Sequence, residues 1–260
     1  MKNLYAFLVA ISFCSVASAQ TKYTYKYVAV SFQPQYTVHT FSAKNTIERD
    51  SLKGIQQNRT GFTIFLQYQK QMGQNLMLQT GIQYTNTGFV RVARNLKFTS
   101  SIHPDVPLID QTIQTTPEPT AEMNYVFDYI DIPVLFNSKI YFTRKASKHW
   151  EFYGTYGASL NFLLQDRVAA RLKGFTIDNK RAFNLKNTYL KSNFFNVTAI
   201  LGLRANYNYS NKLGFLTQPL LSVPLLPATR GDYTYRLLSV GMQIGVYFNL
   251  DVDGEEEIIE

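Results

Sequence analysis

The chain has 260 residues, of which 45% are hydrophobic, 15% aromatic and only 17% charged, and its formal net charge is +8. After the N-terminus there is no run of 18 apolar residues, which excludes a bundle of membrane-spanning helices. Low charge, many aromatics and no apolar run fit a chain whose apolar residues are spread along it at every second position.

Residues 1–19 are predicted to form a secretory signal peptide. One positive charge precedes the apolar run Leu4–Val16, and small residues follow it up to Ala19, so we expect cleavage between Ala19 and Gln20. An uncleaved anchor helix is the alternative, but the apolar run is short for a bilayer. The only cysteine, Cys14, lies in this segment, and the exported chain would therefore be held together without disulfides.

Eight later segments alternate between apolar and polar residues, which predicts strands with one apolar face each. In the last segment every even position is apolar, whereas the odd ones carry Ser, Gly, Gln or Tyr. Prolines at positions 219 and 224 make the seventh segment the weakest prediction. The segments are 27–38, 62–69, 76–85, 125–142, 150–162, 195–207, 213–225 and 238–248.

Short and long connections alternate between these segments. The short ones lie near residues 72–75, 144–149 and 209–211. The long ones are 39–59, 88–124 and 164–192, with a shorter fourth at 227–235. Short periplasmic turns opposite long extracellular loops are typical of outer-membrane barrels.

We therefore predict an all-β fold, a single eight-stranded antiparallel up-and-down transmembrane β-barrel over residues 20–250. It would lie in the cell outer membrane with its N- and C-termini in the periplasm. A soluble sandwich or a lipocalin-like barrel would show the same alternation, but the signal peptide, the missing cysteines and the alternation of loop lengths favour the membrane barrel.

The apolar face would point outward, because lipid offers no hydrogen bonds and a sheet in a membrane must close on itself. The Gln-rich face would then line the lumen. Aromatic residues near strand ends are interpreted as girdles at the two membrane interfaces. These are Tyr68, Tyr84, Phe89, Tyr125, Trp150, Phe162, Phe195, Tyr207 and Phe248.

Charged residues on the polar faces predict a network inside the lumen. Glu151 lies at the start of one predicted strand and Arg204 near the end of the next, so a symmetric hairpin would bring them together at the periplasmic end. We expect an inward salt bridge between them, with Lys139 as a further member; the alternative is that these side chains only fill the lumen. Pro133 cannot donate to a strand ladder, which predicts a bulge there.

Charge is unevenly distributed along the chain. Without Lys2 and the six acids of residues 251–260, 25 basic and 12 acidic residues remain, a net charge of +13. We interpret residues 251–260 as a short acidic periplasmic tail. Export argues against nucleic-acid binding. Basic residues cluster in 164–192 and would face anionic lipopolysaccharide, or would simply be solvated loop charge.

Residues suited to catalysis or cofactor binding form no specific pattern. A hydrolase would need a histidine beside a serine, such as His39 with Ser42 or Ser51, or His103 with Ser100 and Ser101, but any loop of this composition offers such pairs. No Cys or His spacing suggests a metal, and no Gly-rich phosphate loop is present. We predict a protein that is not an enzyme and has no metal or other cofactor.

Two segments resemble a known family. Tyr129, Asp131, Ile132 and Pro133 match the Tyr-x-Asp/Glu-Ile-Pro segment of PorT-like outer-membrane β-barrel proteins of Bacteroidetes-type bacteria, and residues 241–248 resemble their last strand. The resemblance implies an eight-stranded outer-membrane barrel whose final aromatic is read by the barrel-insertion machinery. The family's namesake serves in a secretion and gliding apparatus. The acidic tail departs from the family pattern.

The resulting hypothesis is a monomer in contact with outer-membrane lipid and lipopolysaccharide. It would have a structural or interaction role through long extracellular loops that bind an unidentified protein partner. The alternatives are a subunit of a secretion or gliding apparatus, a narrow transport pore and, least favoured, a loop-borne lipid hydrolase.

Overall fold

Antiparallel β-strands dominate the structure, a computed structural model that describes residues 25–43, 55–73, 75–94, 120–140, 149–173, 183–186, 190–231 and 233–250. The predicted signal peptide, its Ala19–Gln20 cleavage site and the acidic tail lie outside these residues. Among the residues described, no helix combines the length and apolar character needed to cross a membrane.

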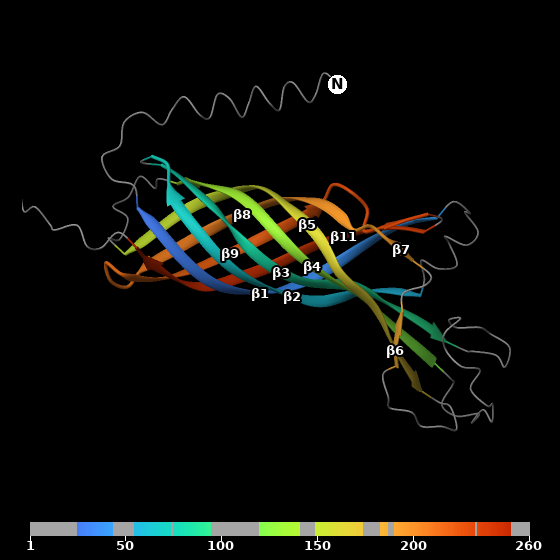
Figure 1. The fold of residues 1–260 in the computed structure, drawn as a ribbon. Coiled ribbons are helices and arrows are strands. Elements are labelled where there is room, and N and C mark those ends of the chain that lie inside the picture. Colours follow the sequence, from blue (N-terminus) through green and yellow to red (C-terminus); the bar gives the residue numbers. More distant parts are fainter. Residues whose placement is uncertain are drawn as a thin grey trace, which may run out of the picture.

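Eight long strands form one closed ring. They are β1 (Lys26–Ala43), β2 (Gln56–Gln71), β3 (Leu76–Arg94), β4 (Thr120–Lys139), β5 (Trp150–Lys173), β8 (Phe195–Asn208), β9 (Leu213–Pro224) and β11 (Tyr233–Asn249). Each pairs antiparallel with the next long strand along the chain, and β11 pairs with β1 to close the ring. The predicted eight-stranded up-and-down barrel is confirmed (Figure 1).

The two ends of the barrel differ. Tight connections join β2 to β3 and β8 to β9, and β1 begins and β11 ends at this same turn end, where Gln71 N donates to Tyr25 O at 2.9 Å and Asn249 N donates to Lys212 O at 2.9 Å. The opposite, loop end carries three short strands: β6 (Phe183–Lys186), which pairs with β5, and β7 (Lys191–Ser192) and β10 (Thr229–Arg230), which pair with each other.

Strands β3, β4 and β5 are longer than the sequence pattern indicates. Strand β3 continues to Arg94, β4 already begins at Thr120, and β5 continues to Lys173. The predicted loop boundaries at residues 88, 124 and 164 were therefore wrong. Their paired ends project past the rim together with β6 (Figure 1). Outside a bilayer the outer face need not be apolar, so these projecting ends lose the alternation that revealed the rest.

The outer surface between the two ends is apolar. Along β11, for example, Val240, Met242, Ile244 and Phe248 are all between 45% and 59% exposed, whereas the odd-numbered residues between them face the lumen. The same outward pattern occurs on the other seven strands, with exposed residues such as Val30, Phe32, Ile64, Leu66, Ile82, Ile132, Val134, Leu160, Leu201, Leu203 and Phe215. A soluble barrel would bury these side chains, so the wall is built for contact with lipid.

The predicted aromatic girdles are only partly present. Trp150 and Phe248 are 42% and 51% exposed on the outer surface, as expected for interfacial aromatics. Phe89 and Tyr125, however, are 0% and 4% exposed and face inward, where their rings stack with centroids 4.7 Å apart. Their assignment to a girdle was wrong, because the inward face changes from polar to aromatic near the loop end.

Prolines within the strands are accommodated without a change of register. At Pro34, Pro133 and Pro219 the ladder with one neighbouring strand skips the proline and resumes with the same register. The missing N–H of each proline therefore removes backbone pairing locally and leaves the strand register unchanged. The bulge predicted at Pro133 was wrong; the β4–β5 register shifts between Asp128 and Tyr129 instead.

Glycines on the inward face leave room for polar side chains of the neighbouring strands to lie directly against their backbone. A Cβ added to Gly245 would lie 2.5 Å from Ser31 Cβ and 2.6 Å from Val30 O. Gly154, by contrast, has no atom within 4 Å of such a Cβ and pairs with the lipid-facing Leu203.

We predict that Gly245→Ala lowers the free energy of unfolding by about 1–3 kcal/mol, the usual cost of overpacking a filled interior. Urea unfolding of the barrel in detergent, followed by tryptophan fluorescence and heat-dependent gel mobility, measures this difference. Gly154→Ala is the matched control and should unfold like the unaltered protein. Equal stability of the two variants would contradict the tight packing of the inner wall.

Candidate functional site

The lumen is filled by uncharged polar side chains from every long strand. Alternation directs them inward, and most are less than 7% exposed. They include Ser31, Gln33, Gln35, Thr37, Thr63, Gln67, Gln69, Gln79, Asn137, Thr155, Ser159, Asn196, Asn206, Gln218, Ser239 and Gln243. The prediction of a packed, Gln-rich interior is confirmed.

Near the turn end, one guanidinium spans the lumen. Arg204 on β8 is 1% exposed and donates from Nε to Asn206 Oδ1 at 2.6 Å, from Nη1 to Gln79 Oε1 at 3.0 Å and from Nη2 to Gln69 Oε1 at 2.8 Å. These amides belong to β8, β3 and β2, so Arg204 ties opposite walls together. We call Arg204 and these three amides the Arg204 layer.

The expected salt bridge between Glu151 and Arg204 does not form. Glu151 instead accepts from Lys139 Nζ at 2.7 Å and from Tyr153 Oη at 3.0 Å. The β5–β8 register pairs Glu151 with Asn206 and Arg204 with Tyr153, which places the arginine two residues deeper in the lumen. Lys139 and Glu151, 30% and 28% exposed, lie closer to the open turn end and form the ion pair there.

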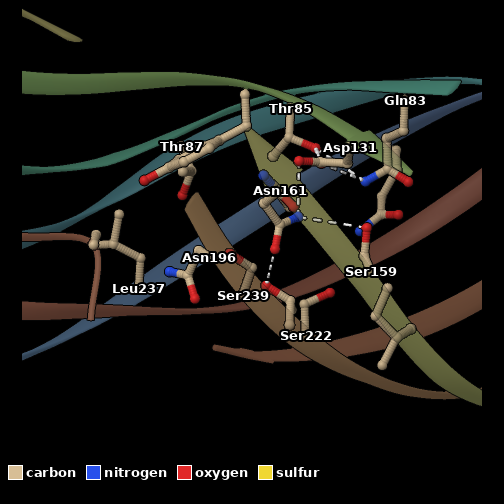
Figure 2. A pocket seen from close by; sticks show the side chains of 16 residues that line it. Gln83, Thr85, Thr87, Asp131, Ser159, Asn161, Asn196, Ser222, Leu237 and Ser239 are labelled. Carbon is tan, nitrogen blue, oxygen red and sulfur yellow. Dashed lines mark hydrogen bonds between the residues drawn. The ribbon is translucent and has the colours of Figure 1, made fainter. Parts of the chain in front are cut away.

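A cavity of about 60 Å³ occupies the middle of the lumen. Asp131 is part of its wall, and Figure 2 shows Thr85, Gln83 and Asn161 directed toward the carboxylate. Thr85 Oγ1 donates to Asp131 at 2.5 Å, Asn161 Nδ2 at 2.8 Å and Gln83 Nε2 at 3.2 Å. Asn161 Oδ1 also accepts from Thr198 at 2.7 Å, which extends the network from β3 to β8.

The residues of the predicted family motif divide between the two faces of β4. Tyr129 and Asp131 are 5% and 1% exposed and line the cavity. Ile132 is 42% exposed on the outer surface, and Pro133 is buried where the β3–β4 ladder skips a pair. The two polar residues of the motif, Tyr129 and Asp131, therefore contribute to the interior of the barrel, whereas Ile132 contributes to its outer wall.

An aromatic cluster fills the lumen at the loop end. Phe89 stacks with Tyr235 at a centroid distance of 4.2 Å, and Phe127 and Leu237 pack in the same cluster. Sequence reasoning missed it, although the signal was visible: on β4 the inward positions change from Asp131 to aromatic residues. We call this group, with Met123, Tyr125, Tyr129, Val168, Ala170, Leu190 and Ala228, the loop-end cluster.

A second buried acid, Asp128, was also missed. It is 0% exposed and accepts from Tyr84 Oη at 2.8 Å, Asn86 Nδ2 at 2.5 Å and Gln165 Nε2 at 2.9 Å, while Arg167 Nη2 lies 3.6 Å away. Alternation places Asp128 on the outer face, between Val126 and Ile130. An acid between apolar residues on the predicted lipid-facing side could have indicated a buried polar network, since a charge in that position requires partners.

The hydrolase alternative gains no support from the described residues. His39 faces inward against Phe89, with ring centroids 5.5 Å apart, whereas Ser42 is an odd number of residues away and exposed on the other face. Ser51 and His103 lie outside the described residues. Within the described part of the chain, no group of three or more His, Cys, Asp or Glu residues could hold a metal ion.

No family model and no curated protein matches the chain. Among solved structures it is similar to Neisserial surface protein A (11% identity, 86% of this chain and 96% of that one, TM-score 0.39). It is also similar to Ail, the attachment invasion locus protein of Yersinia pestis, with 9% identity over 85% of this chain and 97% of that one and a TM-score of 0.32. A third similar structure is the outer membrane protease OmpT from Escherichia coli, with 7% identity over 89% of this chain and 99% of that one and a TM-score of 0.33. The barrel itself is established by the strand pairings of this chain.

We predict that Arg204→Met lowers the free energy of unfolding by about 3 kcal/mol, because three buried amide oxygens lose a charged donor. Denaturant titration in detergent, read by circular dichroism, checks this value. The exposed Arg236 provides the control, since Arg236→Met should change stability by less than about 0.5 kcal/mol. Similar losses in both variants would refute the tying role of Arg204.

Proposed function

We propose that the chain is an integral outer-membrane β-barrel with a sealed lumen, which serves a structural or interaction role at its loop end. The observation that carries this proposal is the closure of the lumen by side chains at both ends. The loop-end cluster, with Phe89 0% exposed, blocks one end, and the Arg204 layer, with Arg204 1% exposed, blocks the other.

Location in the outer membrane is supported by the outer surface and the predicted export signal. Exposed apolar side chains surround the barrel between its ends, and in water such a surface would associate nonspecifically. Asp128, an acid on the outer face, has three hydrogen-bond donors and a nearby arginine. The tight turns and both terminal strand ends would then face the periplasm.

Passage of solutes is disfavoured by the size and filling of the barrel. Eight strands enclose an interior just wide enough for side chains, and here the guanidinium of Arg204 on β8 reaches the amides of Gln79 and Gln69 on the opposite wall. The cavity of about 60 Å³ lies between the loop-end cluster and the Arg204 layer, both of which a solute would have to cross.

An interaction role at the loop end is supported by the uneven rim. Strands β3, β4, β5 and β6 extend past the points where β8 and β9 stop pairing. The PorT-like resemblance does not favour a secretion or gliding role in particular, because its residues Tyr129 and Asp131 lie inside the barrel. These two residues contribute to the packing of the barrel interior and give no information about which partner the protein binds.

The sealed lumen predicts that the purified protein produces no single-channel steps in planar lipid bilayers. Glu151→Ala should be equally silent, because the loop-end cluster still closes the barrel when the Lys139–Glu151 pair is lost. A general porin recorded in the same bilayers controls for insertion and sensitivity. Reproducible steps from the unaltered protein would establish the transport pore instead.

The interaction role predicts site-specific cross-linking in intact cells. A photoreactive amino acid at Arg230, exposed on β10, should yield adducts with a protein. The same group at Leu203, 59% exposed on the lipid-facing wall, is the control and should yield only lipid adducts. Absence of protein adducts at Arg230 and at the neighbouring exposed Lys191 would argue for a purely structural barrel.

A further inference from the structure

The lining of the central cavity contains one acidic side chain and no basic one. Sixteen residues line it, and they include the carboxylate of Asp131 but no lysine, arginine or histidine. The remaining lining residues are mostly neutral hydroxyls and amides, such as Thr87, Ser159 and Ser239. Neither Arg204 nor the amides it binds belong to this lining. The guanidinium of Arg204 therefore bonds to its own three amides and supplies no positive charge to the cavity lining.

Asp131 differs from the other two acids of the barrel wall described above. Glu151 has Lys139 at 2.7 Å, and Asp128 has Arg167 at 3.6 Å. The partners of Asp131 are all neutral: a threonine hydroxyl and two side-chain amides. A carboxylate that is only 1% exposed pays a large desolvation penalty unless a positive charge approaches it.

A second, independent observation lies in the same cavity. The phenol oxygen of Tyr129 is buried and has no hydrogen-bond partner among the described residues, and the residue, 5% exposed, lines the cavity two positions before Asp131 on β4. Buried polar atoms without partners are rare in folded proteins. This oxygen and the Asp131 carboxylate, which has no counter-charge among its hydrogen-bond partners, line the same cavity.

We propose that this cavity binds one small monovalent cation, such as Na⁺, through the Asp131 carboxylate and the Tyr129 phenol oxygen. Hydroxyl and amide oxygens elsewhere in the lining are available as further ligands. A single carboxylate suits one positive charge, whereas Ca²⁺ and Mg²⁺ sites use more acidic ligands or several waters. Softer metals are excluded because the lining has no cysteine or histidine. Water occupies about 30 Å³ per molecule in the liquid, so the cavity has room for such an ion.

The bound cation would stabilise the barrel by linkage, since the unfolded chain lacks the site. Its ligands on β4 are tied to β3 through Thr85 and to β5 through Asn161. The ion would therefore connect three neighbouring strands at mid-height, between the loop-end cluster and the Arg204 layer.

The test measures both stability and bound ion. The barrel is refolded into detergent in NaCl, KCl or N-methyl-D-glucamine chloride at equal ionic strength, and thermal unfolding is followed by circular dichroism. We expect the midpoint to rise with Na⁺ concentration relative to the organic cation. Equilibrium dialysis against ²²Na⁺ should detect about one bound ion per barrel, in line with a single site.

Three variants make the assignment specific. Asp131→Asn keeps the size of the side chain and should abolish ²²Na⁺ binding and the salt-specific rise. Tyr129→Phe should weaken binding by about tenfold, the effect of losing one polar contact. Asp128→Asn is the matched control, an equally buried aspartate on the same strand but outside the lumen, and it should bind ²²Na⁺ like the unaltered protein.

Two results would overturn the proposal. One is an equal midpoint in all three salts together with no retained ²²Na⁺, which would mean that a proton neutralises Asp131. The other is undiminished ²²Na⁺ binding by Asp131→Asn, which would place the ion elsewhere. If K⁺ gives the larger rise, the monovalent site stands and its preference is for the larger ion.

Discussion

Backbone amides within a lipid bilayer have no water to bond, so every one of them must find its partner inside the sheet. The β1–β11 seam, which joins the first and last long strands from Tyr27–Asn249 to Ala43–Tyr233, satisfies this requirement by removing both edges. Closure also reverses the usual arrangement of a protein, because the apolar side chains must face outward. The prolines in the strand interiors obey the same constraint: Pro34, Pro133 and Pro219 occur where one ladder omits a pair and the register continues.

Closure around eight strands leaves an interior that only side chains can fill, and the chemistry of the lumen follows from this. Long neutral amides are suited to it because each both donates and accepts across the barrel. Gln67 and Gln243, from strands on either side of β1, both donate to Ser31. Inward glycines such as Gly245 provide the space for these contacts. The amides and hydroxyls thus solvate the few buried charges in place of water.

The strands were predictable because a bilayer imposes the same alternation on all of them. The sequence therefore predicted the ring, the outward Ile132 and the inward Asp131. It did not predict details that depend on register. Arg204 lies opposite Tyr153 and not Glu151, a displacement of two residues that alternation cannot detect. The loop-end cluster and Asp128 were missed because each breaks the polar-in, apolar-out rule on its own face, and only the pairing of strands shows what surrounds them.

The length of β5 has a consequence for how the protein can be approached. Its residues 163–173 continue beyond Phe162, its last pair with β8, and at roughly 3.3 Å per residue they span about 35 Å of strand. The wall formed by β3, β4 and β5 is therefore much higher than the wall formed by β8 and β9. Of the described residues, those of this high wall are the first that a large molecule descending toward the membrane would meet.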